Sequence, residues 1–214
     1  MRWRLVIATL ALFAMTALAD EKGLIRFQKA DLDKTPAGWK ADKTGEGEGS
    51  VWRVVADDTA PSKSGYVLAQ TAESPGNVFN LCVSNQPNYK DVEVSVAFKA
   101  VQGKKDQGGG IVWRYQDANN YYIARMNPLE DNFRVYKVEE GKRSEPFQSV
   151  DVKVPAGEWH TLKITMLGNH IECYLDEKKL LDARDGTFEA RGKVGLWTKA
   201  DAQTRFDQFT VSGK

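Results

Sequence analysis

The chain has 214 residues, and its 30 Lys and Arg residues nearly balance its 29 Asp and Glu residues, which gives a formal net charge of +1. A charge this close to zero gives no electrostatic reason to expect nucleic acid or an anionic membrane as a partner. A chain of this size buries roughly 70% of the surface that its unfolded form exposes, so it needs no covalent staples to hold one core.

Residues 1–19 have the pattern of a secretory signal peptide. Two arginines precede an apolar run from Leu5 to Ala14, and the small residues Ala17-Leu18-Ala19 follow. We expect cleavage before Asp20. The apolar run is shorter than the roughly 20 residues that a membrane span needs, so no membrane association is expected after cleavage. The mature chain, 20–214, is therefore predicted to be an exported protein, periplasmic or secreted, with one domain.

Apolar and polar residues alternate with period two along most of the mature chain, which is typical of β-strands. Residues 35–50 are predicted to form a loop, with turns at 60–65 and 73–77. Strand patterns follow at 78–84, 91–100, 108–115, 120–127, 132–138, 159–167, 170–176, 192–198 and 204–211. So many antiparallel strands in one domain predict an all-β fold, a sandwich of two antiparallel sheets of the jelly-roll kind.

The two cysteines have different predicted surroundings. Cys82 lies off the apolar face formed by Phe79, Leu81 and Val83, whereas Cys173 lies on the apolar face of its own strand. An exported protein can keep a disulfide, so the sequence leaves open both a disulfide bond and two unpaired thiols. A catalytic cysteine is not expected because no basic partner is in view.

Residues 108–138 contain three arginines among alternating apolar positions. If residues 116–119 and 128–131 are four-residue connections, Arg114 faces Tyr121, Ile123 faces Tyr136, Arg125 faces Arg134 and Asn127 faces Asn132. This register separates a polar face from an apolar layer, whereas a slip by one residue would mix them. We predict that the polar face binds a ligand through Arg114, Tyr121, Arg125, Asn127, Asn132, Arg134 and Tyr136.

The opposition of Arg125 and Arg134 requires a compensating group, because like charges directly across a strand pair cost up to about 1 kcal/mol. A carboxylate on an adjoining strand, such as Glu139, Glu145 or Asp151, would make an ordinary surface network of ion pairs. Alternatively, a ligand accepts hydrogen bonds from the guanidinium groups while the tyrosines of this face supply flat surfaces for stacking. Sugars suit the second interpretation because they are flat and rich in hydroxyl groups.

Several stretches, among them "DQGGGIVWRYQDANNYYIARMNPLEDNFRVYKVEEGKR", "GEWHTLKI" and "GKVGLWTKADAQTRFDQFTV", resemble exported bacterial proteins of the 3-keto-disaccharide hydrolase-like family. That family falls in the concanavalin A-like lectin and glucanase superfamily, and the resemblance covers nearly all of the mature chain. It implies a two-sheet sandwich with carbohydrate on its concave face or rim. The superfamily also includes laminin G-like binders and enzymes that cleave 3-keto-glycosides, so the fold does not decide between binding and catalysis.

The catalytic options are limited by the carboxylates present. The E-x-D-x-x-E strand that equips the glucanases is missing, since Glu172, Asp176 and Glu177 have a different spacing. Elimination from a 3-keto-glycoside needs a base and a group that stabilises the enolate. The arginines suit the second role, and only Glu130 and Asp131, on the loop that borders the polar face, suit the first.

We therefore expect an exported carbohydrate-binding protein, with a 3-keto-glycoside hydrolase or lyase and a structural or protein-docking domain as alternatives. No cofactor is expected, and the sequence does not predict the oligomeric state. His160 and His170 lack the spacing of zinc ligands. Residues 116–120, "QDANN", offer oxygen atoms to calcium, but such residues more often cap their own backbone.

Overall fold

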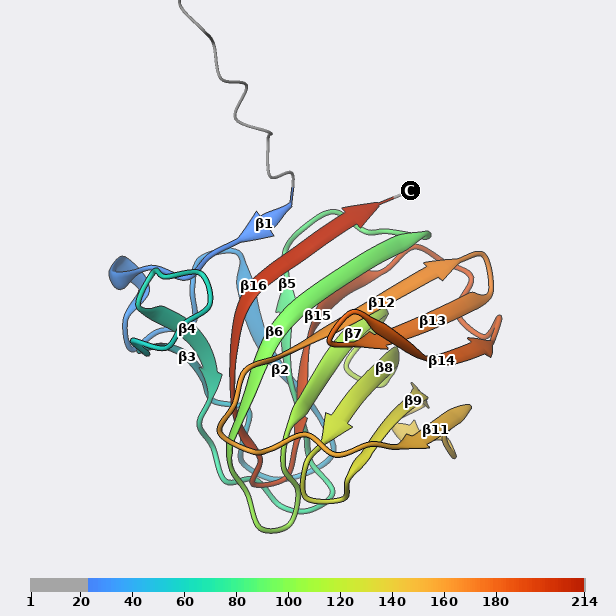
Figure 1. The fold of residues 1–214 in the computed structure, drawn as a ribbon. Helices are drawn as coiled ribbons and strands as arrows, with labels where there is room; N and C mark the ends of the chain where they lie inside the picture. Colours follow the sequence, from blue (N-terminus) through green and yellow to red (C-terminus); the bar gives the residue numbers. More distant parts are fainter. Residues whose placement is uncertain (1–22, 214) are drawn as a thin grey trace, which may run out of the picture.

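The computed structural model describes residues 23–213, which form two antiparallel sheets that pack face to face (Figure 1). The only helical element in this range is a single 3₁₀ turn, η1 (Lys29–Asp31). None of the described residues form a helix long and apolar enough to cross a membrane. The predicted signal peptide and its cleavage site lie outside the described residues.

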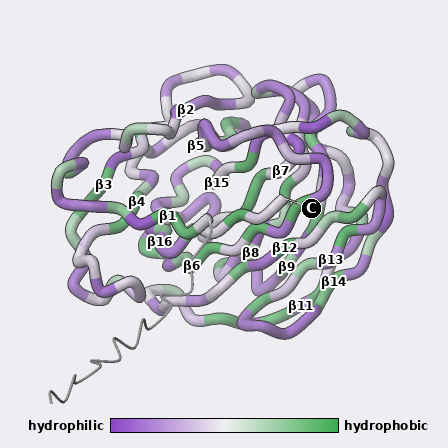
Figure 2. The backbone as a smooth tube through the Cα atoms, turned by 90° about the horizontal axis from the view of Figure 1, so that it is seen from above, coloured by the Kyte–Doolittle hydropathy of each residue, from purple (hydrophilic) through white to green (hydrophobic). Residues whose placement is uncertain are grey.

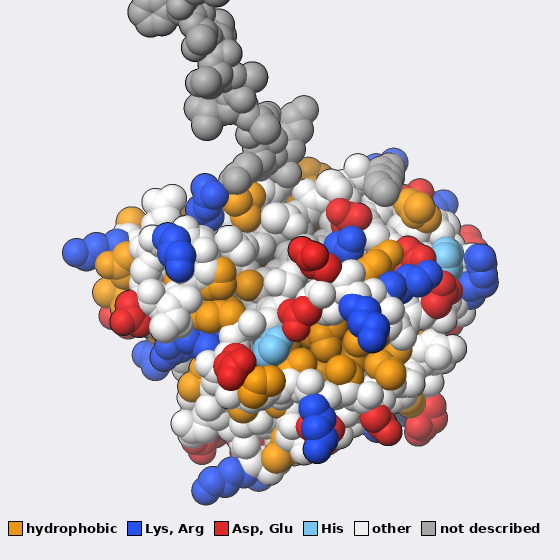
Figure 3. Space-filling view, in the orientation of Figure 1, with side chains coloured by type: hydrophobic (Ala, Val, Ile, Leu, Met, Phe, Trp, Pro, Cys, Tyr) orange, Lys and Arg blue, Asp and Glu red, His pale blue; other side chains and the backbone are white. Residues whose placement is uncertain are grey.

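The first sheet has the strand order β14-β13-β12-β6-β16-β4-β3, and β1 pairs with β16 beside this path. Its strands are β1 (Leu24–Ile25), β3 (Trp52–Ala56), β4 (Tyr66–Gln70), β6 (Val92–Gln102), β12 (His160–Leu167), β13 (His170–Leu175), β14 (Lys178–Arg184) and β16 (Gln203–Gly213). Charges of both signs are interspersed around an apolar patch on the face seen in Figure 3.

The second sheet has the order β10-β9-β8-β7-β15-β5-β2, and β11 pairs with β9 beside β10. Its strands are β2 (Trp39–Thr44), β5 (Phe79–Ser84), β7 (Gly109–Asp117), β8 (Asn120–Asn127), β9 (Asn132–Glu139), β10 (Lys142–Arg143), β11 (Gln148–Asp151) and β15 (Lys193–Lys199). The predicted all-β, two-sheet antiparallel sandwich is confirmed. The predicted loop at 35–50 is wrong in part, because β2 lies within it as a charged edge strand.

The main core lies between the two sheets. Hydrophobic stretches of the chain run along the strands where the two layers face each other, and hydrophilic stretches follow the outer connections (Figure 2). Trp113 and Phe133 from the second sheet share this core with Ile164 and Phe206 from the first, and all four are buried. The two cysteines also lie in this core, fully buried and unpaired.

A second apolar cluster covers the opposite, concave face of the second sheet. Its buried members are Phe79, Leu81, Val83, Val112, Tyr121, Ile123, Val138 and Trp197. Strand β5 is therefore buried on both faces, which corrects the prediction that Cys82 points away from the core. The sequence left open a disulfide bond or two unpaired thiols, and the structure has two unpaired thiols.

The two thiols are expected to be inert in the folded protein. Burial raises the pKa of Cys82, and burial together with nearby carboxylates raises the pKa of Cys173, so neither forms the reactive thiolate at neutral pH. Titration with Ellman's reagent should detect no thiol in native protein and two per chain in denaturant. Rapid reaction of either thiol in the native state would contradict this placement.

The second sheet curls until strands far apart in its order touch. Arg143 of β10 lies 4.5 Å from the ring centroid of Tyr136 and 5.6 Å from that of Phe79 in β5, although four strands separate β10 from β5. The hydroxyl of Thr44 in β2 lies 2.6 Å from that of Tyr121 in β8. These contacts enclose the second apolar cluster within the curl.

Candidate functional site

The hairpin of β8 and β9 has the predicted register. Asn127 faces Asn132, Arg125 faces Arg134 and Ile123 faces Tyr136, across a connection at 128–131. The hairpin of β7 and β8 follows the predicted register only as far as Trp113 and Tyr122. Beyond that pair, residues 114–116 form a β-bulge and Asp117 pairs with Asn120, so the predicted loop at 116–119 is wrong.

The bulge separates Arg114 from the other two arginines. Arg114 has a φ of 45°, in the left-handed region. Its side chain is buried, and only 1% of the residue is exposed. Its Nε, Nη1 and Nη2 donate to the carbonyl oxygens of Lys90, Phe188 and Gly168 at 2.9, 2.7 and 2.6 Å. The prediction that Arg114 shares the polar face is therefore wrong, because a bulge changes the face on which a side chain emerges.

Arg114 instead fastens three separate connections to the sheet, which gives it a structural role. Arg114→Met is expected to destabilise the fold by about 3 kcal/mol or more, because three hydrogen bonds from a buried charged donor are lost. Arg114→Lys should rescue little, since one ammonium group cannot reproduce the planar fork. Urea denaturation measures the change, and Arg134→Met, at a partly exposed position, is the control. Equal stability of the two methionine variants would contradict this role.

Tyr121 lies on the predicted face but within the second apolar cluster, where its hydroxyl group meets Thr44. Burial raises the pKa of this tyrosine above its usual range. The side chain is fully enclosed and is thus a packing residue. The remaining five predicted residues gather at one end of the curled sheet, where β8 ends and β9 begins.

Arg125 is the centre of this group and is only 2% exposed. Its Nη1 donates to Oδ1 of Asn132 at 2.5 Å, and its Nη2 donates to Oε2 of Glu130 at 2.9 Å and to the hydroxyl of Tyr136 at 3.2 Å. Its Nε is buried and has no hydrogen-bond partner within the described part of the chain. A buried donor without an acceptor is costly, and most buried polar groups in folded proteins are hydrogen-bonded.

Glu130 supplies the charge that the opposed arginines require. Its Oε2 lies 2.9 Å from Arg125 and 3.8 Å from Arg134. Burial alone would raise the pKa of Glu130, but the charge and hydrogen bond of Arg125 outweigh it and hold the pKa below its usual range. The sequence pattern suggests such a carboxylate on an adjoining strand, whereas it comes from the connecting loop.

The three strand carboxylates proposed to compensate Arg125 and Arg134 do not form ion pairs with them in the described part of the chain. Glu139 pairs with Lys137 at 3.1 Å, and no ion pair joins Glu145 to either arginine within residues 23–213. Asp151 acts on Arg134 only as a nearby charge, and it is Ser149 of the same strand that accepts a hydrogen bond from Arg134 Nε at 3.0 Å.

Asp106, a residue that sequence reasoning missed, reaches the same end of the sheet from the connection before β7. Its Oδ1 accepts from Asn127 Nδ2 at 3.0 Å, and its Oδ2 lies 3.1 Å from Lys199 Nζ. Burial raises the pKa of Asp106 above its usual range, against the opposing charge of Lys199. The connection is fixed by Asp201, whose carboxylate accepts hydrogen bonds from the backbone N–H groups of Lys104, Lys105 and Asp106.

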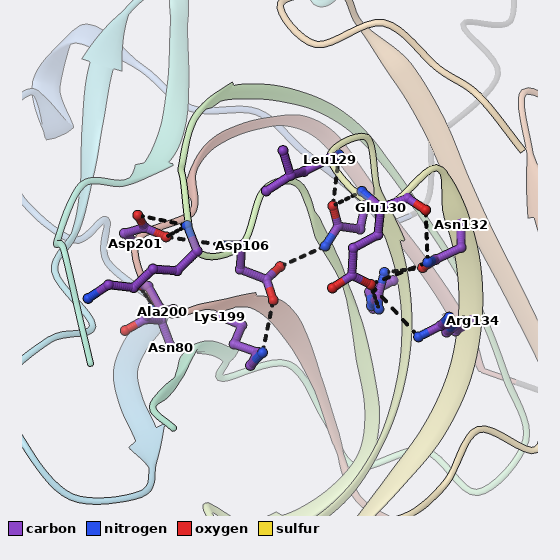
Figure 4. Close-up of polar contacts among 12 residues, drawn as sticks. Asn80, Asp106, Leu129, Glu130, Asn132, Arg134, Lys199, Ala200 and Asp201 are labelled. Atoms are coloured by element: carbon purple, nitrogen blue, oxygen red, sulfur yellow. Dashed lines mark hydrogen bonds and ion pairs between the residues drawn. The ribbon is translucent and has the colours of Figure 1, made fainter. Parts of the chain in front are cut away.

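These residues form one continuous polar group at the end of the curl, which we call the polar mouth: Asp106, Arg125, Asn127, Glu130, Asn132, Arg134, Tyr136 and Lys199. Its accessible side chains are Glu130, Arg134 and Lys199, which are 40%, 32% and 22% exposed. In Figure 4, Asp106 and Lys199 lie on one side, Glu130 and Arg134 lie on the other, and Leu129 borders them. These three side chains can contact a ligand, and the other members, which are each at most 4% exposed, support them from below.

The remaining residues singled out from the sequence lie outside the polar mouth. Asp131 is on the same loop, but its carboxylate pairs with Lys153 at 3.5 Å. In the "QDANN" turn, Asp117 accepts from the backbone N–H of Asn119 and from the Asn120 amide, so these residues cap their own turn.

Both histidines pair with carboxylates. His160 lies 2.8 Å from Asp176, and His170 lies 2.8 Å from Asp182. His170, Asp182 and Glu172 bring potential ligand atoms within 4.8 Å of one another. Lys179 Nζ already lies 2.9 Å from Glu172 and 3.1 Å from Asp182, so a lysine supplies the positive charge there.

Comparisons with known proteins give a family and a fold. A family model described as a 3-keto-alpha-glucoside-1,2-lyase-like domain matches residues 27–212. No curated protein matches the sequence. Among solved structures, the carbohydrate-binding module CBM66 from Bacillus subtilis is similar with a TM-score of 0.65 at 19% identity, over 82% of this chain and 96% of that chain.

Two further similar structures come from glycoside hydrolases. Domain 4 of AbnA, a GH43 extracellular arabinanase from Geobacillus stearothermophilus in complex with arabinotriose, has a TM-score of 0.56 at 12% identity, over 89% of this chain and 90% of that one. The GH43 protein BlXynB from Bacillus licheniformis has a TM-score of 0.54 at 16% identity, over 85% of this chain and 40% of that one. At these identities the likenesses show a shared sandwich fold.

Proposed function

Because the chain belongs to the family of 3-keto-alpha-glucoside-1,2-lyase-like domains, we propose that it is an exported protein that binds carbohydrate at the polar mouth. The observation that carries the proposal is the convergence of three accessible groups, Glu130, Arg134 and Lys199, on a rigid hydrogen-bonded base. The names of two similar structures support the ligand class, since one is a carbohydrate-binding module and the other holds arabinotriose.

The chemistry of the polar mouth suits a sugar. A carboxylate beside a guanidinium group offers acceptors and donors together, and vicinal hydroxyl groups present the complementary pair. Leu129, half exposed at the border, offers an apolar surface for the C–H face of a sugar ring. Arg125 holds Glu130 and Asn132 in place, so the accessible groups are oriented before a ligand arrives.

Arg134→Ala and Glu130→Ala are expected to weaken sugar binding by 30-fold or more each, because a charged hydrogen-bonding group is worth about 2 kcal/mol. A glycan array identifies the ligand, and calorimetry measures the dissociation constants. Asp131→Ala is the matched control, since its carboxylate belongs to the same loop but pairs with Lys153. Binding that survives both substitutions, or an array without any ligand, would refute the proposal.

A second function is favoured by one observation, the presence of two carboxylates with opposite pKa shifts in the polar mouth. The pKa of Asp106 is raised by burial and that of Glu130 is lowered by Arg125. Carboxyl groups whose environments separate their pKa values are typical of acid–base catalysis. We therefore propose, as the alternative, that the protein cleaves 3-keto-glycosides by elimination, with Asp106 as the base.

A further inference from the structure

We infer that the sandwich carries a second ligand site, for a small sugar acid, at the end opposite the polar mouth. Asp106 of the polar mouth precedes β7, whereas Arg114 lies near the other end of that strand. At this other end β6 begins and β16 reaches the last described residues (Figure 1). A cavity of about 290 Å³ opens there, lined by Lys90, Arg114, Gly168, Asn169, Gly186 and Glu189.

The walls of this cavity come from three connections, namely 85–91 between β5 and β6, 168–169 between β12 and β13, and 185–192 between β14 and β15. Arg114 donates a hydrogen bond to one carbonyl oxygen in each of them. Asp91 of the first connection also accepts a backbone hydrogen bond from the second at 2.8 Å. The walls are therefore held in place before a ligand arrives, which lowers the cost of binding. The volume is close to the lower limit of small-molecule pockets, roughly 300 Å³.

The inner wall carries a buried positive charge. Arg114 is buried, whereas the other five lining residues are exposed. The carbonyl groups that accept its hydrogen bonds are neutral, and the carboxylate of Asp91 lies 3.7 Å from Nη2, beyond hydrogen-bond range. Burial lowers the pKa of Arg114, and nearby negative charges, those of Asp91 and Glu189 among them, oppose this only in part. Buried charges are normally paired, so an anionic group in the cavity would supply the charge that the carbonyl groups lack.

The donors and acceptors of the cavity define the chemistry of the ligand. A guanidinium group has five N–H donors, and within residues 23–213 Arg114 uses three of them. The remaining donors and the ammonium group of Lys90 suit a carboxylate. Asn169 and Glu189 offer acceptors on the accessible side, which suit hydroxyl groups because a hydroxyl donates to an amide or carboxylate oxygen. A carboxylate together with hydroxyl groups is the chemistry of a sugar acid.

The test is a titration of the ¹⁵N-labelled protein with D-glucuronate at constant ionic strength, followed by NMR. We expect the backbone amide signals of Gly168 and Gly186 to shift. Glucose lacks the carboxylate, acetate lacks the hydroxyl groups, and phosphate lacks the shape of the sugar. We expect each of these three compounds to bind at least tenfold more weakly than glucuronate.

Lys90→Ala should weaken glucuronate binding at least tenfold, because it removes the accessible charge but keeps the backbone carbonyl that Arg114 requires. This variant replaces Arg114→Met, which destabilises the fold. Lys63→Ala is the matched control, since Lys63 is exposed and lies outside the cavity. It should leave the affinity within twofold, and so should Arg134→Ala in the polar mouth.

The second site would be overturned by unchanged signals at Gly168 and Gly186, by equal affinity for phosphate and glucuronate, or by equal affinity of the native protein and Lys90→Ala. A tenfold loss in Arg134→Ala would place glucuronate in the polar mouth and would also overturn it. Binding of neutral sugars, and its loss in Arg134→Ala, bears only on the proposed function, so the two claims can fail separately.

Discussion

Asp57→Ala is expected to lower the free energy of unfolding by about 3–5 kcal/mol, because it leaves a buried lysine without its counter-charge. Lys99 Nζ lies 2.6 Å from Asp57 Oδ2, and both side chains are at least 90% buried. Arg205 donates to the same oxygen at 2.8 Å. Asp58→Ala is the matched control, since its side chain is exposed. Urea denaturation measures both variants, and equal stability would refute the role of Asp57.

The same carboxylate makes stability depend on pH. Burial alone would raise the pKa of Asp57, but hydrogen bonds from Lys99, Thr59 and Arg205 outweigh it and hold the pKa well below its usual range. A depressed pKa contributes stability that is present above the unfolded value of about 4 and is lost as the pH falls toward the folded value. The difference between the native protein and Asp57→Ala should therefore be constant at neutral pH and shrink below about pH 4.

The sequence predicts well those structural features that depend on residues close together in the chain. The hairpin of β8 and β9 combines period-two alternation with a short polar connection, and these two features define the register that places Arg125 opposite Arg134. The apolar partners of this hairpin, such as Phe133 and Met126, face the main core for the same reason.

The errors arise where distant segments decide the structure. The bulge at Arg114 is stabilised by carbonyl groups 24 to 74 residues away, so no local pattern reveals it. Asp106 reaches the polar mouth because β7 lies between β8 and β15, which brings it beside Asn127 and Lys199. The alternation in β5 predicts one buried face, but the curl of the sheet buries both.

Asp106→Asn is expected to lower the rate of 3-keto-disaccharide cleavage by about 100- to 1000-fold if the protein acts by elimination. In that reaction a base takes the proton from carbon 2, beside the 3-keto group. The electrons of that bond form a double bond between carbons 1 and 2, the bond from carbon 1 to the glycosidic oxygen breaks, and the released oxygen takes a proton. Asp106 suits the first step because a raised pKa makes its carboxylate the stronger base.

Glu130→Gln should have a smaller effect on the rate, since Arg125 lowers the pKa of Glu130 and weakens it as a base. Arg134 and Lys199 would supply positive charge for the enolate, so their alanine variants should lower kcat more than they raise KM. With Asp106 as the base, activity falls as the pH drops through its raised pKa, and Asp131→Asn leaves this profile unchanged. An assay for the released sugar distinguishes binding from catalysis. If the native protein binds the 3-keto-disaccharide without cleaving it, the enzymatic proposal is refuted.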